Sequence, residues 1–210
     1  MKRTWKKLAV LAVITAIAMV LPGPLTSADD HGRKTIEGKF RFTSAGTCLA
    51  AIGGFVDHEQ FLLTNPALWD MGVGAEWEGV YTFHRNGTGE LNAFGRGVDL
   101  PSPALGGTPS VSLGHVFWKF TYTVDDGTIT FTYVPGTFMN KLLYGPQQGQ
   151  TAYLNVLGSW FGHLSPDGKN LAVSWGVPLV LQPTADQANT QNLPVEVICN
   201  VVQQGFRTEE

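Results

Sequence analysis

The stretch Trp118–Tyr133, WKFTYTVDDGTITFTY, decides the fold class. Aromatic and aliphatic residues alternate with Lys or Thr on both sides of Asp125-Asp126-Gly127. Alternation with a period of two indicates a β-strand with one buried face, and an Asp-Gly pair between two such runs is typical of a hairpin turn. We therefore predict a β-hairpin with an aromatic, buried face and a threonine-rich face that meets water.

The same pattern recurs on both sides of this hairpin. One predicted hairpin turns at Asn86-Gly87 and another at Ser165–Gly168, and both turns are rich in residues that tolerate the required backbone angles. With a first and a last strand, the chain has eight expected strands, at about 36–43, 77–83, 91–93, 118–124, 128–133, 153–164, 170–181 and 195–203. The expected fold is all-β, a single antiparallel barrel of about eight strands, with a β-sandwich as the alternative.

Closure of the barrel is expected between the first and last strands. The run 195–202 is too apolar to be a safe exposed edge, and pairing it with the first strand would remove both edges of the sheet. Three longer segments, 53–76, 95–114 and 135–151, are predicted as connections, with a short helix at 58–71. Such loops serve as functional rims or as ordinary connectors, and the sequence favours neither.

The N-terminus has the three parts of a secretory signal peptide. A basic segment, Met1–Lys7, precedes an apolar run, Leu8–Leu21, and small residues follow at 26–28. The apolar run has 14 residues, short of the roughly 18 that a membrane span needs. We expect cleavage after Ala28, no membrane span after processing, and a secreted or periplasmic protein. The expected organisation is a signal peptide at 1–28, a disordered N-terminus at 29–35, a β-barrel domain at 36–205 and a disordered tail at 206–210.

Charge and cysteine content restrict the partners and the compartment. Loss of the four basic residues of the signal changes the net charge from −3 to −7, which argues against a nucleic-acid partner. The chain has two cysteines, Cys48 and Cys199, and two lone cysteines in an oxidising compartment usually pair. We predict a disulfide between them. The oligomeric state has no signature in the sequence.

Known catalytic, cofactor and metal motifs are missing from the sequence. It has no G-x-S-x-G, H-E-x-x-H, C-x-x-C, G-x-x-x-x-G-K or G-x-G-x-x-G pattern, so no cofactor and no metal site is predicted and no enzyme class is indicated. Four carboxylates, Glu78, Glu90, Asp99 and Glu196, lie near strands. A buried pair on adjacent strands would suit acid–base chemistry, but the solvated face is the default position.

Aromatic residues are the strongest functional signal. Twelve fall at expected inward positions: Phe40, Phe42, Trp77, Tyr81, Phe83, Trp118, Phe120, Tyr122, Phe131, Tyr133, Trp160 and Trp175. An eight-stranded barrel is just wide enough either to be filled by side chains or to hold one small ligand. Both outcomes stay open. If a small apolar molecule binds, we expect it in the interior or at the mouth, among six candidate residues: Trp77, Tyr81, Trp118, Tyr122, Tyr133 and Trp160.

Two short motifs carry a family resemblance. The segment Trp77–Phe83, WEGVYTF, precedes Asn86–Gly89, and Ile198-Cys199-Asn200 lies in the last strand. Together with the eight expected strands, they resemble lipocalin-like (calycin) barrels and allene-oxide-cyclase-type barrels. They are also similar to a group of uncharacterised secreted bacterial proteins with a Gly-x-Tyr-Thr-Phe strand and an Ile-Cys-Asn last strand. The resemblance implies an up-and-down barrel.

Three functions are compatible with these features. The first is a module that binds a small hydrophobic ligand, and the second is a structural or interaction protein of the cell envelope with a packed barrel. The third is a cyclase- or isomerase-type barrel enzyme. Room inside the barrel would distinguish the first from the second, and a buried carboxylate or Asn in that room would favour the third.

Overall fold

The computed structural model describes residues 36–105, 108–145, 148–157, 159–174, 179–183 and 195–208. The signal peptide predicted at 1–28, the N-terminus at 29–35 and the predicted inward residue Trp175 lie outside the described residues. Eleven strands form one antiparallel sheet, and two more form a separate small hairpin. No helix in the described segments is long and apolar enough to cross a membrane.

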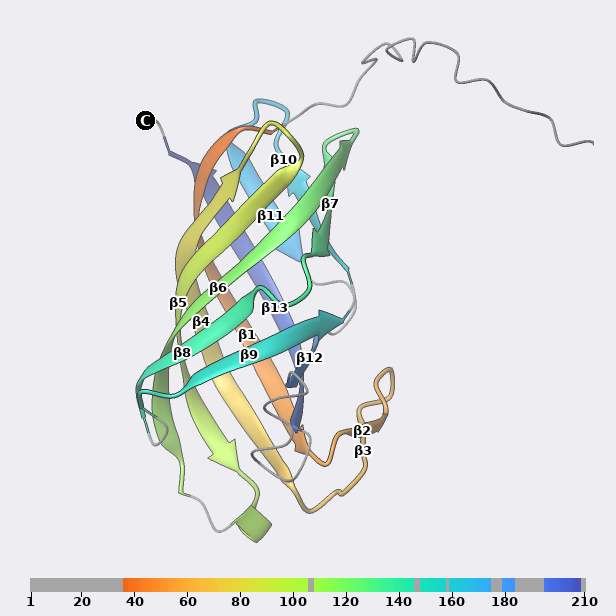
Figure 1. The fold of residues 1–210 in the computed structure, drawn as a ribbon, viewed down its shortest axis with the longest axis vertical. Coiled ribbons are helices and arrows are strands. Elements are labelled where there is room, and N and C mark those ends of the chain that lie inside the picture. The colour runs from red at the N-terminus through yellow and green to blue at the C-terminus, as the bar shows by residue number, and fades with distance from the viewer. Residues whose placement is uncertain are drawn as a thin grey trace, which may run out of the picture. The chain divides into compact units, whose positions relative to one another are not determined.

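Five long strands run through the whole sheet. They are β1 (Gly38–Ile52), β4 (Trp69–Phe83), β5 (Thr88–Pro101), β6 (Ser110–Asp125) and β13 (Val195–Arg207). They lie side by side in the order β13-β1-β4-β5-β6, with every neighbour antiparallel. Figure 1 shows these strands along the length of the sheet. A 3-10 turn, η1 (Pro103–Leu105), follows β5.

The first ring closes this sheet through eight strands. Three short strands, β7 (Thr128–Tyr133), β10 (Trp160–Leu164) and β11 (Asn170–Ser174), connect β6 to β13. β7 pairs with the segment Phe120–Asp125 of β6, and β11 pairs with the segment Val202–Phe206 of β13. Because β13 also pairs with β1, the hydrogen bonds run through β1, β4, β5, β6, β7, β10, β11 and β13 and return to β1.

A second ring closes on the other half of the long strands. Here β8 (Phe138–Tyr144), β9 (Thr151–Leu157) and β12 (Leu179–Pro183) connect β6 to β13. β8 pairs with Leu113–Phe117 of β6, and β12 pairs with Val197–Cys199 of β13. In Figure 1, β8 and β9 cross in front of the lower half of the sheet. One wall of the sheet is therefore divided between two sets of short strands, so the ring is not an even barrel.

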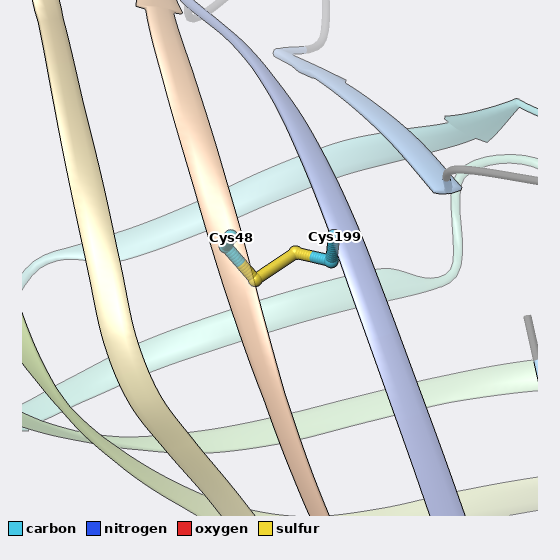
Figure 2. Close-up of a disulfide and its surroundings, with 2 residues drawn as sticks. All are labelled: Cys48 and Cys199. Carbon is cyan, nitrogen blue, oxygen red and sulfur yellow. A yellow bond between two sulfur atoms is a disulfide. The ribbon is translucent and has the colours of Figure 1, made fainter.

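The predicted closure and disulfide are confirmed. β1 pairs with β13 without interruption from Phe40 opposite Arg207 to Ile52 opposite Val195. Cys48 and Cys199 lie directly opposite each other in this pair, with their Cα atoms 4.0 Å apart, and are joined by a disulfide (Figure 2). The last strand continues through Arg207, past the predicted domain end at 205, because Phe206 pairs with both Arg41 and Asn170.

Several expectations about individual segments are wrong. The predicted connection 135–151 contains β8, and the predicted strand 170–181 is divided between β11 in the first ring and β12 in the second. Residues 153–164 do not form one strand: β9 pairs with β8 and β12 in the second ring, whereas β10 pairs with β7 and β11 in the first. Most of the predicted loop 95–114 lies in β5 and β6, which pair as far as Asp99 opposite Ser110. The predicted helix at 58–71 is absent.

A small hairpin occupies the region of that predicted helix. β2 (Phe55–Asp57) pairs with β3 (Leu62–Leu63), and Phe55 packs with Ala51 and Ile198 in a separate apolar cluster. The Glu196 carboxylate accepts a hydrogen bond from the Phe55 amide at 2.8 Å and lies 3.0 Å from His58 Nε2. Glu196, one of the four carboxylates singled out in the sequence, therefore helps to hold the hairpin to β13.

Candidate functional site

The interior of the first ring is filled with aromatic side chains. Phe40, Tyr81, Phe120 and Phe131 are completely buried, and Trp160 is 2% exposed. Phe131 stacks on Trp160 with ring centroids 5.3 Å apart, and Phe120 meets Phe131 edge to face at the same distance. Rings in these arrangements attract one another beyond the effect of their burial. The described side chains of the first ring therefore form a closed hydrophobic core.

Three of the six predicted ligand-binding residues are tyrosines whose hydroxyl groups already have protein partners. Tyr81 donates to Gln203 Oε1, and burial raises the pKa of Tyr81, so the hydroxyl keeps its proton. The Tyr122 hydroxyl reaches the carbonyls of Ile36 and His84 and donates to one of them at a time. The Tyr133 hydroxyl donates to the Leu154 carbonyl and accepts from the Phe138 amide. These bonds tie segments of the fold together.

Trp118 and Gln203 lie inside the sheet where the two rings meet. Trp118 stacks on Phe138 of β8, at 5.2 Å, and meets Trp160 of β10 edge to face, at 6.4 Å. Trp118 is 3% exposed and Gln203 is 1% exposed. Among the described residues, the Trp118 Nε1 and Gln203 Nε2 atoms have no hydrogen-bond partner. Buried donors without a partner are costly, so each is a point where a ligand or water oxygen would be stabilising.

Small residues line the second ring from the long strands. Residues directly opposite each other in a sheet project to the same side. Starting from the buried core of the first ring, the register therefore identifies which residues of each long strand face inward in the second ring. The inward positions of the second ring include Gly46, Gly72, Ala75, Gly95, Gly97, Ser112 and Gly114. The inward side chains that the long strands supply to the second ring are therefore much smaller than the aromatic side chains that fill the interior of the first ring.

Two of these glycines make room for larger side chains. A Cβ atom on Gly95 would lie 2.2 Å from Cδ1 of Trp77, so the indole lies directly across β5. A Cβ on Gly114 would lie 2.4 Å from Asn140 Oδ1, so the amide of Asn140 lies across β6 in the same way. Gly95 and Gly114 are register partners, which brings the Trp77 indole and the Asn140 amide to neighbouring positions inside the ring. Asn140 Oδ1 is buried and has no partner among the described residues.

Solvent reaches the inward side chains of the second ring. Cys48, Trp77, Leu154, Val156 and Val197 all face inward by register and pack against the core, yet each is only partly buried. In the first ring most corresponding positions, such as Phe40 and Tyr81, are buried, and Leu164 at the mouth is partly exposed. Of the six predicted ligand-binding residues, Trp77 is the one that the structure leaves partly exposed.

Two carboxylates face the interior of the second ring. Asp70 lies opposite Ala50 and Pro101, and Asp99 lies opposite Gly72 and Ser110, which are all inward positions. Burial raises the pKa of the Asp70 carboxyl, and the negative charge of Asp99 raises it further, against a smaller lowering effect of the Met71 and Leu100 amides. Asp70 Oδ1 is buried and has no partner among the described residues.

Sequence reasoning missed Asp70, Asn140 and the inward position of Asp99. A signal was present in Gly95, Gly97 and Asp99, which alternate at the β-strand period, but their Gly-rich surroundings favoured a loop. Glu78 and Glu90 lie on the outward face, opposite Thr43 and Lys119 respectively.

A half-open depression of about 920 Å³ lies at the far end of the first ring, at the barrel mouth. The apolar residues Ile36, Val124 and Leu164 line it together with charged groups. Arg85 pairs with Glu37 at 2.7 Å, and Arg207 Nη2 donates to the Glu37 carbonyl at 2.6 Å. These groups join the strand ends and hairpin turns around the mouth.

Metal ligands do not cluster in the described segments: no group of three or more His, Cys, Asp or Glu side chains is placed to hold an ion there. Comparison with known proteins adds no further constraint on the site. No protein-family model matches this chain, and no curated protein sequence matches it either.

Proposed function

We propose that this protein is an exported β-barrel that binds a small, mainly apolar molecule inside the second ring. The observation that carries the proposal is the partial exposure of Cys48, Trp77, Leu154, Val156 and Val197, apolar side chains that face the interior. Apolar surface that is enclosed by a sheet and still in contact with water gains free energy when a ligand covers it.

The disulfide supports the exported location, because such bonds persist in oxidising compartments. The lipocalin-like relation belongs to the same proposal: an antiparallel ring of eight strands with a ligand inside is the arrangement that the sequence motifs suggested. A ligand of about fifteen heavy atoms at about −0.3 to −0.5 kcal/mol per atom would bind with a micromolar dissociation constant.

The test is a titration of purified, delipidated protein with hydrophobic dyes and uncharged apolar probes, followed by tryptophan emission. Trp77 in the second ring would report binding directly. Ser112→Phe places a ring on an inward, partly exposed position opposite Gly97 and is expected to weaken binding at least about tenfold by occupying the space. Thr121→Phe adds the same ring to the exposed face of the same strand and is expected to leave binding unchanged. Absence of saturable binding in the unmodified protein would refute the proposal.

A second candidate is a cyclase- or isomerase-type enzyme. Asp70, Asp99 and Asn140 face the same interior, and the raised pKa of Asp70 makes its carboxyl group a better proton acceptor than an ordinary Asp. Conversion of a bound probe, lost in Asp70→Asn while binding is retained, would favour the enzyme over the binding module.

A further inference from the structure

On the described strands of the second ring, every basic side chain projects outward, and the charged side chains that project inward are acidic. Three basic residues lie on its described strand segments: Arg96, His115 and Lys141. Arg96 is opposite Glu76 and bonded to it at 2.5 Å, and His115 is opposite both Phe94 and Lys141, so all three side chains project outward. The charged residues that the register turns inward on these segments are Asp70 and Asp99, and both are acidic.

The two carboxylates lie close enough to act on one ligand group. Asp70 is opposite Pro101 on β5, and Asp99 is two residues before Pro101, which makes them diagonal neighbours on one face of a strand pair. Side chains in this relation are within reach of a common partner. Burial raises the pKa of Asp70, and the nearby charge of Asp99 raises it further, which agrees with this proximity.

An independent feature at the other end of the same interior also points to a ligand. Gln203 is opposite Ser44, which is opposite Trp77, so Gln203 belongs to the row of inward residues where the rings meet. Its Oε1 accepts from Tyr81, while Nε2 is buried and has no partner in the described part of the chain. The Trp118 indole nitrogen is also buried and has no hydrogen-bond partner among the described residues. Along the inward face, N–H donors near the boundary between the rings are thus followed by apolar side chains and then by carboxylates near the strand ends.

We infer that the ligand of the second ring is an uncharged or cationic amphiphile and that anionic lipids such as fatty acids are excluded. A ligand oxygen that reaches the boundary between the rings accepts from Gln203 or from Trp118, and an N–H or O–H group near the strand ends donates to Asp70 and Asp99. A carboxylate ligand would add a third negative charge to an interior into which no basic side chain of the described strands projects. The free-energy cost of removing that carboxylate from water would not be offset by a favourable charge interaction. This inference rests on the proposed function and specifies its ligand class.

The experiment compares octylamine, octanol and octanoate as competitors of a bound hydrophobic dye at neutral pH. These probes share an alkyl chain and differ in the charge of one group. The unmodified protein is expected to bind octylamine and octanol at least about tenfold more tightly than octanoate, as expected for one unit charge near two carboxylates. In Asp70→Asn/Asp99→Asn the preference for amine over carboxylate is expected to disappear, while octanol still binds.

Asp126→Asn is the matched control. Asp126 is exposed in the hairpin turn at the opposite end of the barrel and has a φ of 42°, a conformation that Asn tolerates. The same loss of charge there is expected to leave the order of the three probes unchanged. Equal binding of octanoate and octylamine by the unmodified protein would overturn the inference and leave the binding function standing. A preference that depends on Asp126 would place the ligand at the mouth and overturn it too, whereas failure of all three probes and the dye would refute the binding function itself.

Discussion

The two rings share five long strands but have very different interiors. Along β6, the inward residues are Val124, Tyr122, Phe120 and Trp118 in the first ring, and Val116, Gly114, Ser112 and Ser110 in the second. β1 changes in the same way, from Phe40 and Phe42 to Ser44, Gly46 and Cys48. On both strands, the inward side chains become smaller from the first ring to the second. Strand periodicity sets which residues face inward, and the size of those residues sets how fully each interior is packed.

The difference also concerns how each half is stabilised. The first ring has stacked and edge-to-face aromatic rings, whereas the second has the disulfide between β1 and β13. Dense packing and a covalent link are alternative ways to offset the entropy lost on folding. If the second ring binds a ligand as proposed, its interior cannot be densely packed, and a covalent link is the expected alternative there.

The largest effect is expected from removing the disulfide with Cys48→Ser/Cys199→Ser. The bond links residues 151 apart in sequence. For such a loop, the chain-entropy model gives a loss of about 5 kcal/mol, an upper value because unfolded chains are compact. Chemical denaturation measures the loss. Amide exchange under native conditions should accelerate in Gly46–Ile52 and Val195–Val201 and change little in β7 and β10; a uniform acceleration would contradict the division into two differently stabilised halves.

A smaller effect is expected from matched truncations in the two interiors. Phe131→Ala removes a completely buried ring that stacks on Trp160 and should cost about 3–5 kcal/mol. Leu154→Ala removes a partly exposed side chain of the second ring and should cost about 1–2 kcal/mol, because less surface returns to water and little new space is created. The free energies of unfolding of both variants should be compared with and without a bound probe, and equal losses would show that the second interior is as tightly packed as the first.

Sequence reasoning predicted the first ring better than the second for a physical reason. In Trp118–Tyr133, alternation, propensity and a turn with positive φ at Asp126 and Gly127 all favour one local structure. The pairing of the last strand with the first followed from the apolar run near Cys199. In the second ring, Gly95 is a strand residue that the Trp77 indole requires to be small, and a sequence does not distinguish such a glycine from one in a turn.

The separation of the predicted strand 153–164 into β9 and β10 could not be predicted either. Both β9 and β10 have strand character. β9 pairs with its neighbour in sequence, β8, whereas β10 pairs with β7, which is separated from it in sequence by β8 and β9. Asp70 and Asn140 were missed for a similar reason: one lies in a segment predicted as helix and the other in a predicted connection, so no inward face was assigned to them.

The smallest effect is a pH dependence of opposite sign at the two ends of the barrel. The pKa of Asp70 is raised from 3.8 by burial and by Asp99, so between 3.8 and its raised pKa the folded protein binds more protons than the unfolded chain. Asp70 therefore destabilises the fold increasingly as pH rises through that range. The pKa of Asp167, in the turn at the mouth, is lowered from 3.8 by hydrogen bonds from Ser165 and the Lys169 amide, so its contribution is favourable above 3.8 and is lost as pH falls through its lowered pKa. Asp70→Asn should thus be more stable than the unmodified protein at neutral pH and Asp167→Asn less stable, with both differences shrinking at acid pH. Denaturation midpoints measured from neutral to acid pH test this, and a stability difference of the same sign in both variants would mean that the second interior stabilises a buried charge as effectively as an exposed turn does.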